Sequence, residues 1–389
     1  MKRPKLGRRS GLPREAEHLL WLANGLAESG SRAEDMFWDS RLGEAVDEIL
    51  HEDGEDILNA ALDHLYASNP PAHDALADAV ESRSESGAAE PSHQQALLIA
   101  APVLAWSRFS IPANVLSASV LANLRVHLSA HVLAANVKLG LASVLFSPEQ
   151  LPQGYCETSR FAADLAQVAM RNRDLQIDAE TLPEAARFLS DVRYVVAAVV
   201  ADPGAPLFRW QEKDGSRESA AAQWRTQGGA SLNSALPGCA MELVLPDAYF
   251  AASRQADRAS RPYSIRASVA FLSTTLNIAP GELRAIVAPF HDRQLEEYRI
   301  GFTTLQNPAV VHGVVWPLLG IEDDNADVPQ QIEQCLRECG ITQIVQLDQR
   351  FPMEYCDDCG APMYPGPDGE VAHAELPEDT ADQVPRHLH

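Results

Sequence analysis

The segment that most constrains the fold is residues 297–318, which predicts two strands joined by a short turn. In the first strand, side chains alternate between two faces with the period of a half-buried strand. The turn at 305–308 ends in Pro308, which cannot donate to a strand ladder. The return segment 310–316 is almost wholly apolar, so we expect a central strand covered on both faces. The alternating residues are Tyr298, Ile300 and Phe302 on one face and Arg299, Gly301 and Thr303 on the other.

Around this strand pair the chain divides into regions of different pattern. After a basic tail at 1–11, which we expect to be disordered, apolar residues at helical spacing predict a helical region at 12–82. Strand and helix patterns then alternate in two stretches, 94–230 and 239–349, and an acidic tail follows at 351–389. The predicted fold class is α+β: an N-terminal helical region, two related ferredoxin-like α/β units and a zinc-knuckle-like tail.

The two α/β stretches share the order of their predicted elements, which suggests an internal duplication. Each opens with an apolar strand that ends at a proline and leads to a long helix. Later in each, a strand begins at a tyrosine, a turn with proline follows, and the next strand carries a tryptophan. A short helix is also expected at 183–189. The matching segments are 96–101 before Pro102 and 241–245 before Pro246, the strands from Tyr194 and Tyr298, and the strands 206–211 and 310–316.

Composition limits the partners and the compartment. The chain has 389 residues and a formal net charge of −23, and so negative a surface repels phosphate backbones. The longest apolar run, 96–106, is too short to cross a bilayer, and no secretory signal follows the basic N-terminus. Six cysteines are too few for a disulfide scaffold in a chain of this length. We therefore expect a cytoplasmic protein with no nucleic-acid or membrane partner.

The motif with the clearest chemical content is Cys356-Asp-Asp-Cys359-Gly. Two residues between thiolates let both sulfurs reach one tetrahedral ion, and the glycine permits the tight turn. Structural zinc takes four ligands, so the tail histidines His373, His387 and His389 are the candidates for the remaining positions. The predicted cofactor is a structural Zn²⁺ held by ligands from this set.

Two other interpretations of the cysteine pair stay open. A redox pair is disfavoured, because the motif follows no thioredoxin-like strand–helix turn and the two aspartates between the sulfurs should raise their pKa. Two free thiols in a disordered tail are the remaining alternative. Elsewhere, Cys335 and Cys339 lie on the apolar stripe of a predicted helix and are assigned to packing. His127 and His131 have the spacing of two ligands on one helix face, but the glutamate of a metalloprotease motif is absent.

Catalytic signatures are otherwise missing. The sequence has no phosphate-binding glycine loop, no nucleophile elbow and no metalloprotease helix. An enzyme would have to use polar residues in and beside the apolar strands of the second unit, facing a cleft between the two units. The candidates for catalysis are His291, Arg299 and His312.

Four segments also carry a likeness to a known family: 206–211, 298–302, 312–318 and 356–360. Together they resemble an uncharacterised betaproteobacterial family known only as domain of unknown function 2863. The resemblance extends over nearly the whole chain, and it implies no activity, cofactor or site residue.

Two functional hypotheses follow. The first is a cytoplasmic binding or regulatory protein that has a structural zinc in its tail and contacts a protein partner through exposed surfaces. The alternative is an enzyme that acts on a small molecule at the interface of the two α/β units.

Overall fold

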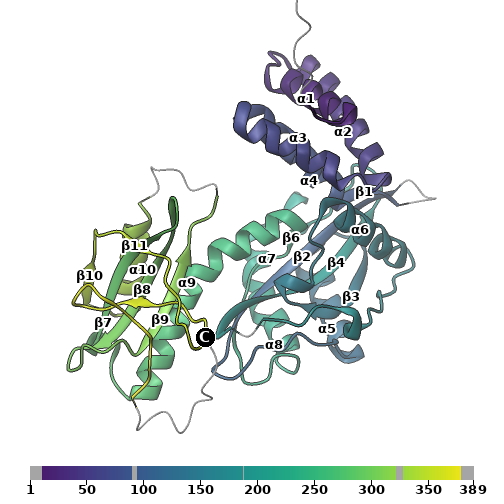
Figure 1. Ribbon diagram of the computed structural model, residues 1–389. Coiled ribbons are helices and arrows are strands. Elements are labelled where there is room, and N and C mark those ends of the chain that lie inside the picture. The colour runs from purple at the N-terminus through teal and green to yellow at the C-terminus, as the bar shows by residue number, and fades with distance from the viewer. Residues whose placement is uncertain (1–10, 90–93, 187, 321–326, 378–389) are drawn as a thin grey trace, which may run out of the picture.

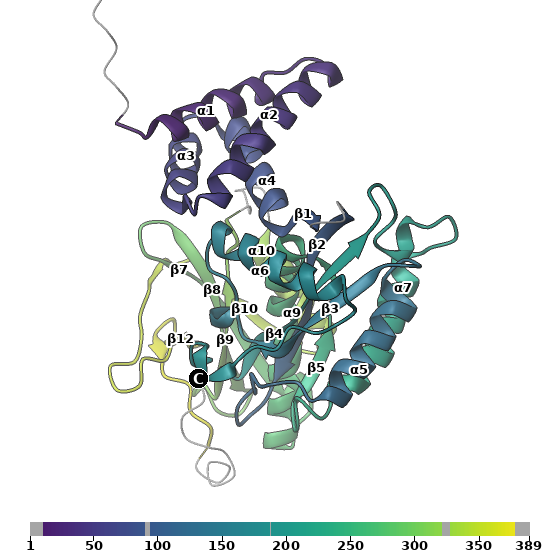
Figure 2. The same cartoon turned by 90° about the vertical axis from the view of Figure 1, so that its right-hand side faces the viewer.

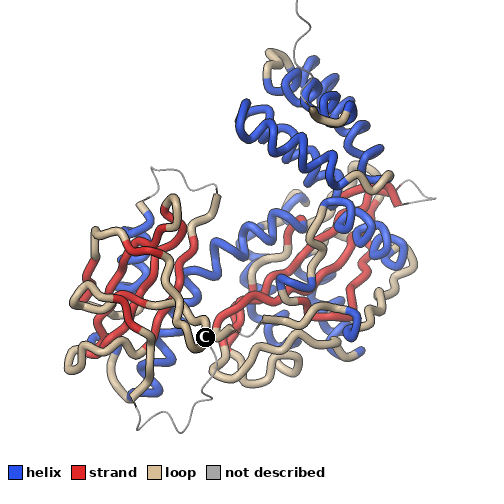
Figure 3. Tube along the Cα trace, in the orientation of Figure 1, coloured by secondary structure: helices blue, strands red, loops and turns tan. Residues whose placement is uncertain are grey.

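The computed structural model describes residues 11–89, 94–186, 188–320 and 327–377 (Figure 1). Four N-terminal helices lie at one end of a larger sheet, and the long helix α9, Tyr249–Leu276, runs from that sheet to a smaller one. Figure 3 shows the two sheets as separate groups of strands. The predicted mixed α+β fold with an N-terminal helical region is confirmed. The predicted disorder of the basic tail falls almost entirely outside the described residues.

The N-terminal helices pack their apolar stripes into a core of their own. Ser31 begins the second helix, where its side chain accepts a hydrogen bond from the backbone N–H of Glu34. Pro70 stands in the first turn of the fourth helix, where its missing N–H costs no helical hydrogen bond. No described helix has the length and apolar composition needed to cross a bilayer. The four helices are α1 Arg14–Ala27, α2 Arg32–His51, α3 Glu55–Ser68 and α4 Pro70–Glu85.

The larger sheet is antiparallel and is covered on both faces. Alternate residues of its long strand β2 enter two different cores, Ile99 and Val103 on one face and Leu98 and Leu104 on the other. The order is β1-β2-β4-β3, and β5 and β6 also pair with β2. The strands are β1 Ser86–Ala89, β2 Gln94–Trp106, β3 Lys138–Phe146, β4 Ser190–Ala201, β5 Ala240–Leu243 and β6 Asp247–Ala248. The helices are α5 Ala118–His127, α6 Tyr155–Ala169, α7 Arg217–Gln223 and α8 Gly229–Leu232.

The prediction that Pro102 ends its strand is wrong. Strand β2 continues to Trp106 and pairs with β4 throughout. The other edge of β2 pairs with β6 at residues 99–100 and with β5 at 103–106, so Pro102 falls between these two ladders. The Pro102 carbonyl faces that edge, where it accepts from the Val244 N–H at 2.9 Å, and its nitrogen has no ladder bond to lose there.

Two further local predictions are wrong. The described residues of 183–189 contain no helix. Segment 206–211 forms no partner strand, because residues Arg209–Gln211 make a 3₁₀ turn. The Gln211 side-chain oxygen accepts from the backbone N–H groups of Leu207 and Phe208 at 2.7 and 2.9 Å, which closes the chain on itself.

The smaller sheet has one face on helices. Ile300 and Phe302 point into a core formed with α9 and α10, whereas Arg299 and Gly301 point to the other face, as the alternation predicts. The order is β10-β7-β8-β9, and β10 and β11 run parallel to β7. The elements are β7 Leu283–His291, β8 Leu295–Thr304, β9 His312–Pro317, α10 Val328–Glu338, β10 Gln343–Gln346 and β11 Phe351–Pro352.

The return strand was predicted to be central, and this is wrong because β9 stands at the end of the sheet order. The apolar composition of β9 is explained instead by what covers its two faces. Val314 and Trp316 enter the core with α9, and Gly313 lies under the tail that follows the sheet. A strand can therefore be covered on both faces and still have only one strand neighbour.

The internal duplication is not confirmed. In the larger sheet, helices separate β2, β3 and β4 along the chain, whereas β7, β8 and β9 follow one another directly. The strand at 241–245, expected to open the second unit, is β5 and pairs with β2 of the larger sheet. The ferredoxin-like character of the two units is likewise not shown.

Two glutamates of the helical region cap helices of the α/β part. The Glu55 carboxylate accepts from the backbone N–H groups of Tyr155 and Cys156, at 3.0 and 2.8 Å, at the start of α6. The Glu85 carboxylate accepts from the Phe250 N–H at 2.9 Å at the start of α9. Neither helix has a side-chain cap of its own, so these carboxylates satisfy free N–H groups and face the positive end of each helix dipole.

We predict that Glu55→Ala lowers the free energy of unfolding by about 1–2 kcal/mol, because two helix-capping hydrogen bonds are lost. Urea denaturation measures the change. Asp56→Ala is the matched control, since Asp56 stands in the same first turn of α3 and is exposed. An equal loss in both variants would show that the contact with α6 contributes nothing.

A pH dependence follows from Glu85. Burial raises the pKa of this carboxyl to about 7. The unfolded chain releases the proton near pH 4.5, so the stabilising contribution of protonated Glu85 is complete below that pH and is lost as the pH rises through 7. We predict that Glu85→Gln reduces the stability difference between pH 5 and pH 8 by about 1–2 kcal/mol, after allowance for solvent screening. Glu48→Gln, at an exposed position of α2, should leave the profile unchanged.

Candidate metal centre

The tail after β11 begins with a tight loop that holds the two cysteines. The backbone N–H of Cys356 donates to the Ala361 carbonyl at 2.7 Å, and the N–H of Gly360 donates to the Cys356 carbonyl at 2.8 Å. Gly360 has φ of +73°, a left-handed conformation that glycine adopts without strain. The sequence prediction of a turn that needs this glycine is therefore confirmed.

A small hairpin brings a histidine to this loop. Strand β12, Tyr364–Pro365, pairs with β13, Val371–Ala372, and His373 follows directly. The His373 Nε2 atom lies 3.3 Å from the Cys359 Sγ atom. The ligand atoms of Cys356, Cys359 and His373 all lie within 4.8 Å of one another. Three of the five predicted ligands therefore meet, although His373 lies fourteen positions after Cys359 in the chain.

The surroundings favour metal-binding forms of these side chains. Hydrogen bonds from the backbone N–H groups of Asp358 and Cys359, together with the Cys359 side chain, lower the pKa of the Cys356 thiol, and desolvation and the Asp358 charge oppose them. We expected the two aspartates to raise this pKa; Asp358 does so, but the hydrogen bonds to the sulfur outweigh it. The His373 Nδ1 atom lies 3.4 Å from the Glu375 carboxylate, so Nε2 is the nitrogen turned toward the cysteines.

This donor set suits zinc. Two thiolates and one imidazole are typical zinc ligands, and a carboxylate behind the histidine is a usual partner in such sites. Among the described residues no fourth His, Cys, Asp or Glu ligand joins this cluster. The other two predicted ligands, His387 and His389, lie outside the described residues.

Arg299 attaches the loop to the smaller sheet. Its side chain is fully buried, and its Nη1 atom donates to the carbonyls of Glu354 and Met363 at 2.6 and 2.8 Å, on either side of the cysteine pair. Its Nε atom donates to the Glu297 carboxylate at 2.6 Å. The guanidinium also lies 4.2 Å from the ring centre of Phe290. The charge is therefore paired, hydrogen-bonded and stacked, which makes its burial tolerable.

Two glycines make room for the hairpin on the same face of the sheet. Gly301 of β8 and Gly313 of β9 are directly paired. A Cβ atom on Gly301 would lie 2.2 Å from the Pro365 carbonyl oxygen, and one on Gly313 would lie 2.3 Å from the Tyr364 ring. Figure 2 shows the hairpin with β12 beside this sheet. Sequence reasoning missed this role of the glycine pair, because neither position indicates what lies above it.

The three candidates for catalysis do not form one site. Arg299 faces the tail, whereas His312 faces α9, where its Nε2 atom lies 3.0 Å from the Ser268 hydroxyl. His291 ends β7 beside Pro352 of β11. Since Arg299 and His312 lie on opposite faces of the sheet, they cannot act on one substrate together.

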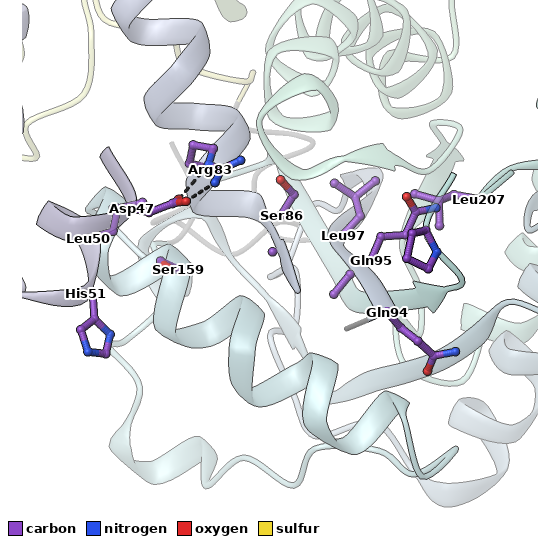
Figure 4. A pocket seen from close by; sticks show the side chains of 13 residues that line it. Asp47, Leu50, His51, Arg83, Ser86, Gln94, Gln95, Leu97, Ser159 and Leu207 are labelled. Atoms are coloured by element: carbon purple, nitrogen blue, oxygen red, sulfur yellow. Dashed lines mark hydrogen bonds and ion pairs between the residues drawn. The ribbon is translucent and has the colours of Figure 1, made fainter. Parts of the chain in front are cut away.

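None of these three candidates lines either of two cavities formed by described residues. The first, about 660 Å³, lies between the helical region and β2 (Figure 4). Several of its polar side chains are paired within the protein: Arg83 pairs with Asp47, and the Gln95 amide donates to the Ala205 carbonyl. The second, about 530 Å³, lies beside α9 and Trp316.

The remaining candidates agree with packing roles. Cys335 is buried in the core beneath α10, and Cys339 packs at its edge. The His127 and His131 rings stack with centroids 6.0 Å apart, and His131 Nε2 lies 3.0 Å from the Gln227 side-chain oxygen.

Comparison with known proteins places this chain in a family. Residues 4–387 match the family described as protein of unknown function, DUF2863, so the chain belongs to that family. The resemblance found in the sequence is thereby confirmed. No curated protein and no solved structure matches the chain.

The glycine pair yields a prediction. Gly301→Ala should lower the free energy of unfolding by about 1–3 kcal/mol and should speed amide hydrogen exchange in residues 353–373, because the new methyl group displaces the hairpin. Gly281→Ala is the control, since its Cβ would approach only the Gly340 carbonyl, at 3.8 Å. Unchanged exchange in the Gly301 variant would contradict the packing described.

Proposed function

We propose that this protein is a binding or regulatory protein whose C-terminal tail is closed by a structural zinc ion. The observation that carries the proposal is the convergence of Cys356, Cys359 and His373, with their ligand atoms within 4.8 Å of one another. Zinc supplies a tetrahedral crosslink between the cysteine loop and the hairpin. A fourth ligand comes from His387, His389 or solvent.

The composition of the tail supports a structural role for the metal. Few tail residues are buried, among them Phe351 and Ala361, so the tail has little hydrophobic core of its own. Metal binding to a segment that is otherwise weakly stabilised adds directly to its folding free energy. Arg299 and the glycine pair determine where the crosslinked tail lies on the smaller sheet.

The enzyme hypothesis has less support. Its three residues do not converge, and the metal ligands include an exposed thiol, Cys359, rather than a group at the base of a pocket. The cytoplasmic location and the contact with a protein partner are part of our proposal, and the next section develops the contact.

Metal analysis tests the zinc. We predict roughly one zinc per purified chain, and less than a fifth of that in Cys356→Ser or His373→Ala, because three protein ligands are the least that hold structural or catalytic zinc tightly. Cys239→Ser is the matched control, since Cys239 lies outside the cluster. The double variant His387→Ala/His389→Ala tests the fourth ligand. Wild-type protein with less than about a tenth of an equivalent of zinc would end the proposal.

A further inference from the structure

Helices α1 and α2 expose a group of large apolar side chains on the helical region. Trp21 is 56% exposed, Phe37 53% and Met36 66%. Single exposed apolar residues are ordinary, but several together on one surface of a small helical region mark a contact site. We call the connected rings the aromatic patch, and it comprises His18, Trp21, Phe37 and Trp38.

The rings of the patch form a connected series. Trp21 meets Trp38 edge to face at 5.1 Å between centroids, Phe37 meets Trp38 at 5.2 Å, and His18 stacks on Trp21 at 5.7 Å. The Trp38 ring lies against Gly25 of α1, where a Cβ atom would come within 2.8 Å of it. The rings are therefore held by one another and by α1, so a partner would lose little side-chain entropy in binding them.

The charge around the patch indicates what kind of partner fits. Residues 14–85 contain eighteen acidic residues and four arginines, a balance of −14 out of the −23 of the whole chain. Asp35 and Asp39, neighbours of the patch on α2, are exposed. A second copy of this surface, a nucleic acid or an anionic membrane would be repelled. A segment that offers both apolar and cationic side chains would bury the rings and neutralise the charge.

We propose that the aromatic patch binds a basic amphipathic segment of a protein partner. Apolar side chains of that segment cover Trp21 and Phe37, and its lysines and arginines lie against the surrounding carboxylates. Tryptophan in such a setting is a frequent centre of binding energy. This proposal rests on the proposed role as a binding protein but not on the zinc, so the metal analysis and the test below can fail separately.

The test uses the full-length protein and a fluorescent peptide made only of leucine and lysine, patterned as an amphipathic helix. We expect saturable binding by anisotropy, weakened at least tenfold by Trp21→Ser/Phe37→Ser, since the loss of about 1.4 kcal/mol corresponds to that factor. Both side chains are more than half exposed, so the variant should fold. Tyr66→Ser is the matched control: Tyr66 is 74% exposed on α3, outside the patch, and its loss should leave binding unchanged.

Two further peptides test the charge and the apolar side chains separately. Replacing every lysine by glutamate should abolish binding, and replacing every leucine by serine should weaken it to the level of the Trp21/Phe37 variant. Equal affinity of wild type and that variant, or equal binding of the glutamate peptide, would overturn the proposal. A wild-type dimer in solution that the variant converts to a monomer would also overturn it, because the patch would then bind a second copy.

Discussion

The buried guanidinium of Arg299 is the contact on which the candidate site depends. It joins a strand of the smaller sheet to two carbonyls on either side of the cysteine loop, and Glu297 balances its charge from the same strand face. Removing one partner of a buried ion pair leaves an uncompensated charge, so both residues are required together. The loop that holds Cys356 and Cys359 is in this way oriented by the sheet before any metal contributes.

Side-chain hydrogen bonds to the backbone also connect the helical region to the α/β part. Glu55 and Glu85 reach from one region to the helix starts of the other, at α6 and α9. Helix α9 then continues to the smaller sheet, with its first half packed on the larger sheet and its second half in the core of the smaller one. Side-chain hydrogen bonds at two helix starts thus help to position the aromatic patch relative to the rest of the chain.

Much of the local structure could be predicted from the sequence. The alternation around Arg299 indicates burial of one strand face, and the spacing of Cys356 and Cys359 indicates a tight turn, because both depend on neighbours within a few residues. The prediction that a strand stops at Pro102 was wrong because its outcome depends on residues distant in the chain. Proline breaks a ladder only where its nitrogen faces a partner, and that depends on which strands meet β2.

The sequence by itself determined the helical region, the alternation of strand faces, the acidic charge and the two thiols of the candidate metal cluster, since each is a property of composition or short spacing. Only the tertiary structure decided which histidine meets the cysteines, that β9 lies at a sheet edge, and that Arg299 and His312 face opposite ways. These relations join residues far apart in the chain. They are set by packing and pairing between elements, on which short-range pattern carries no information.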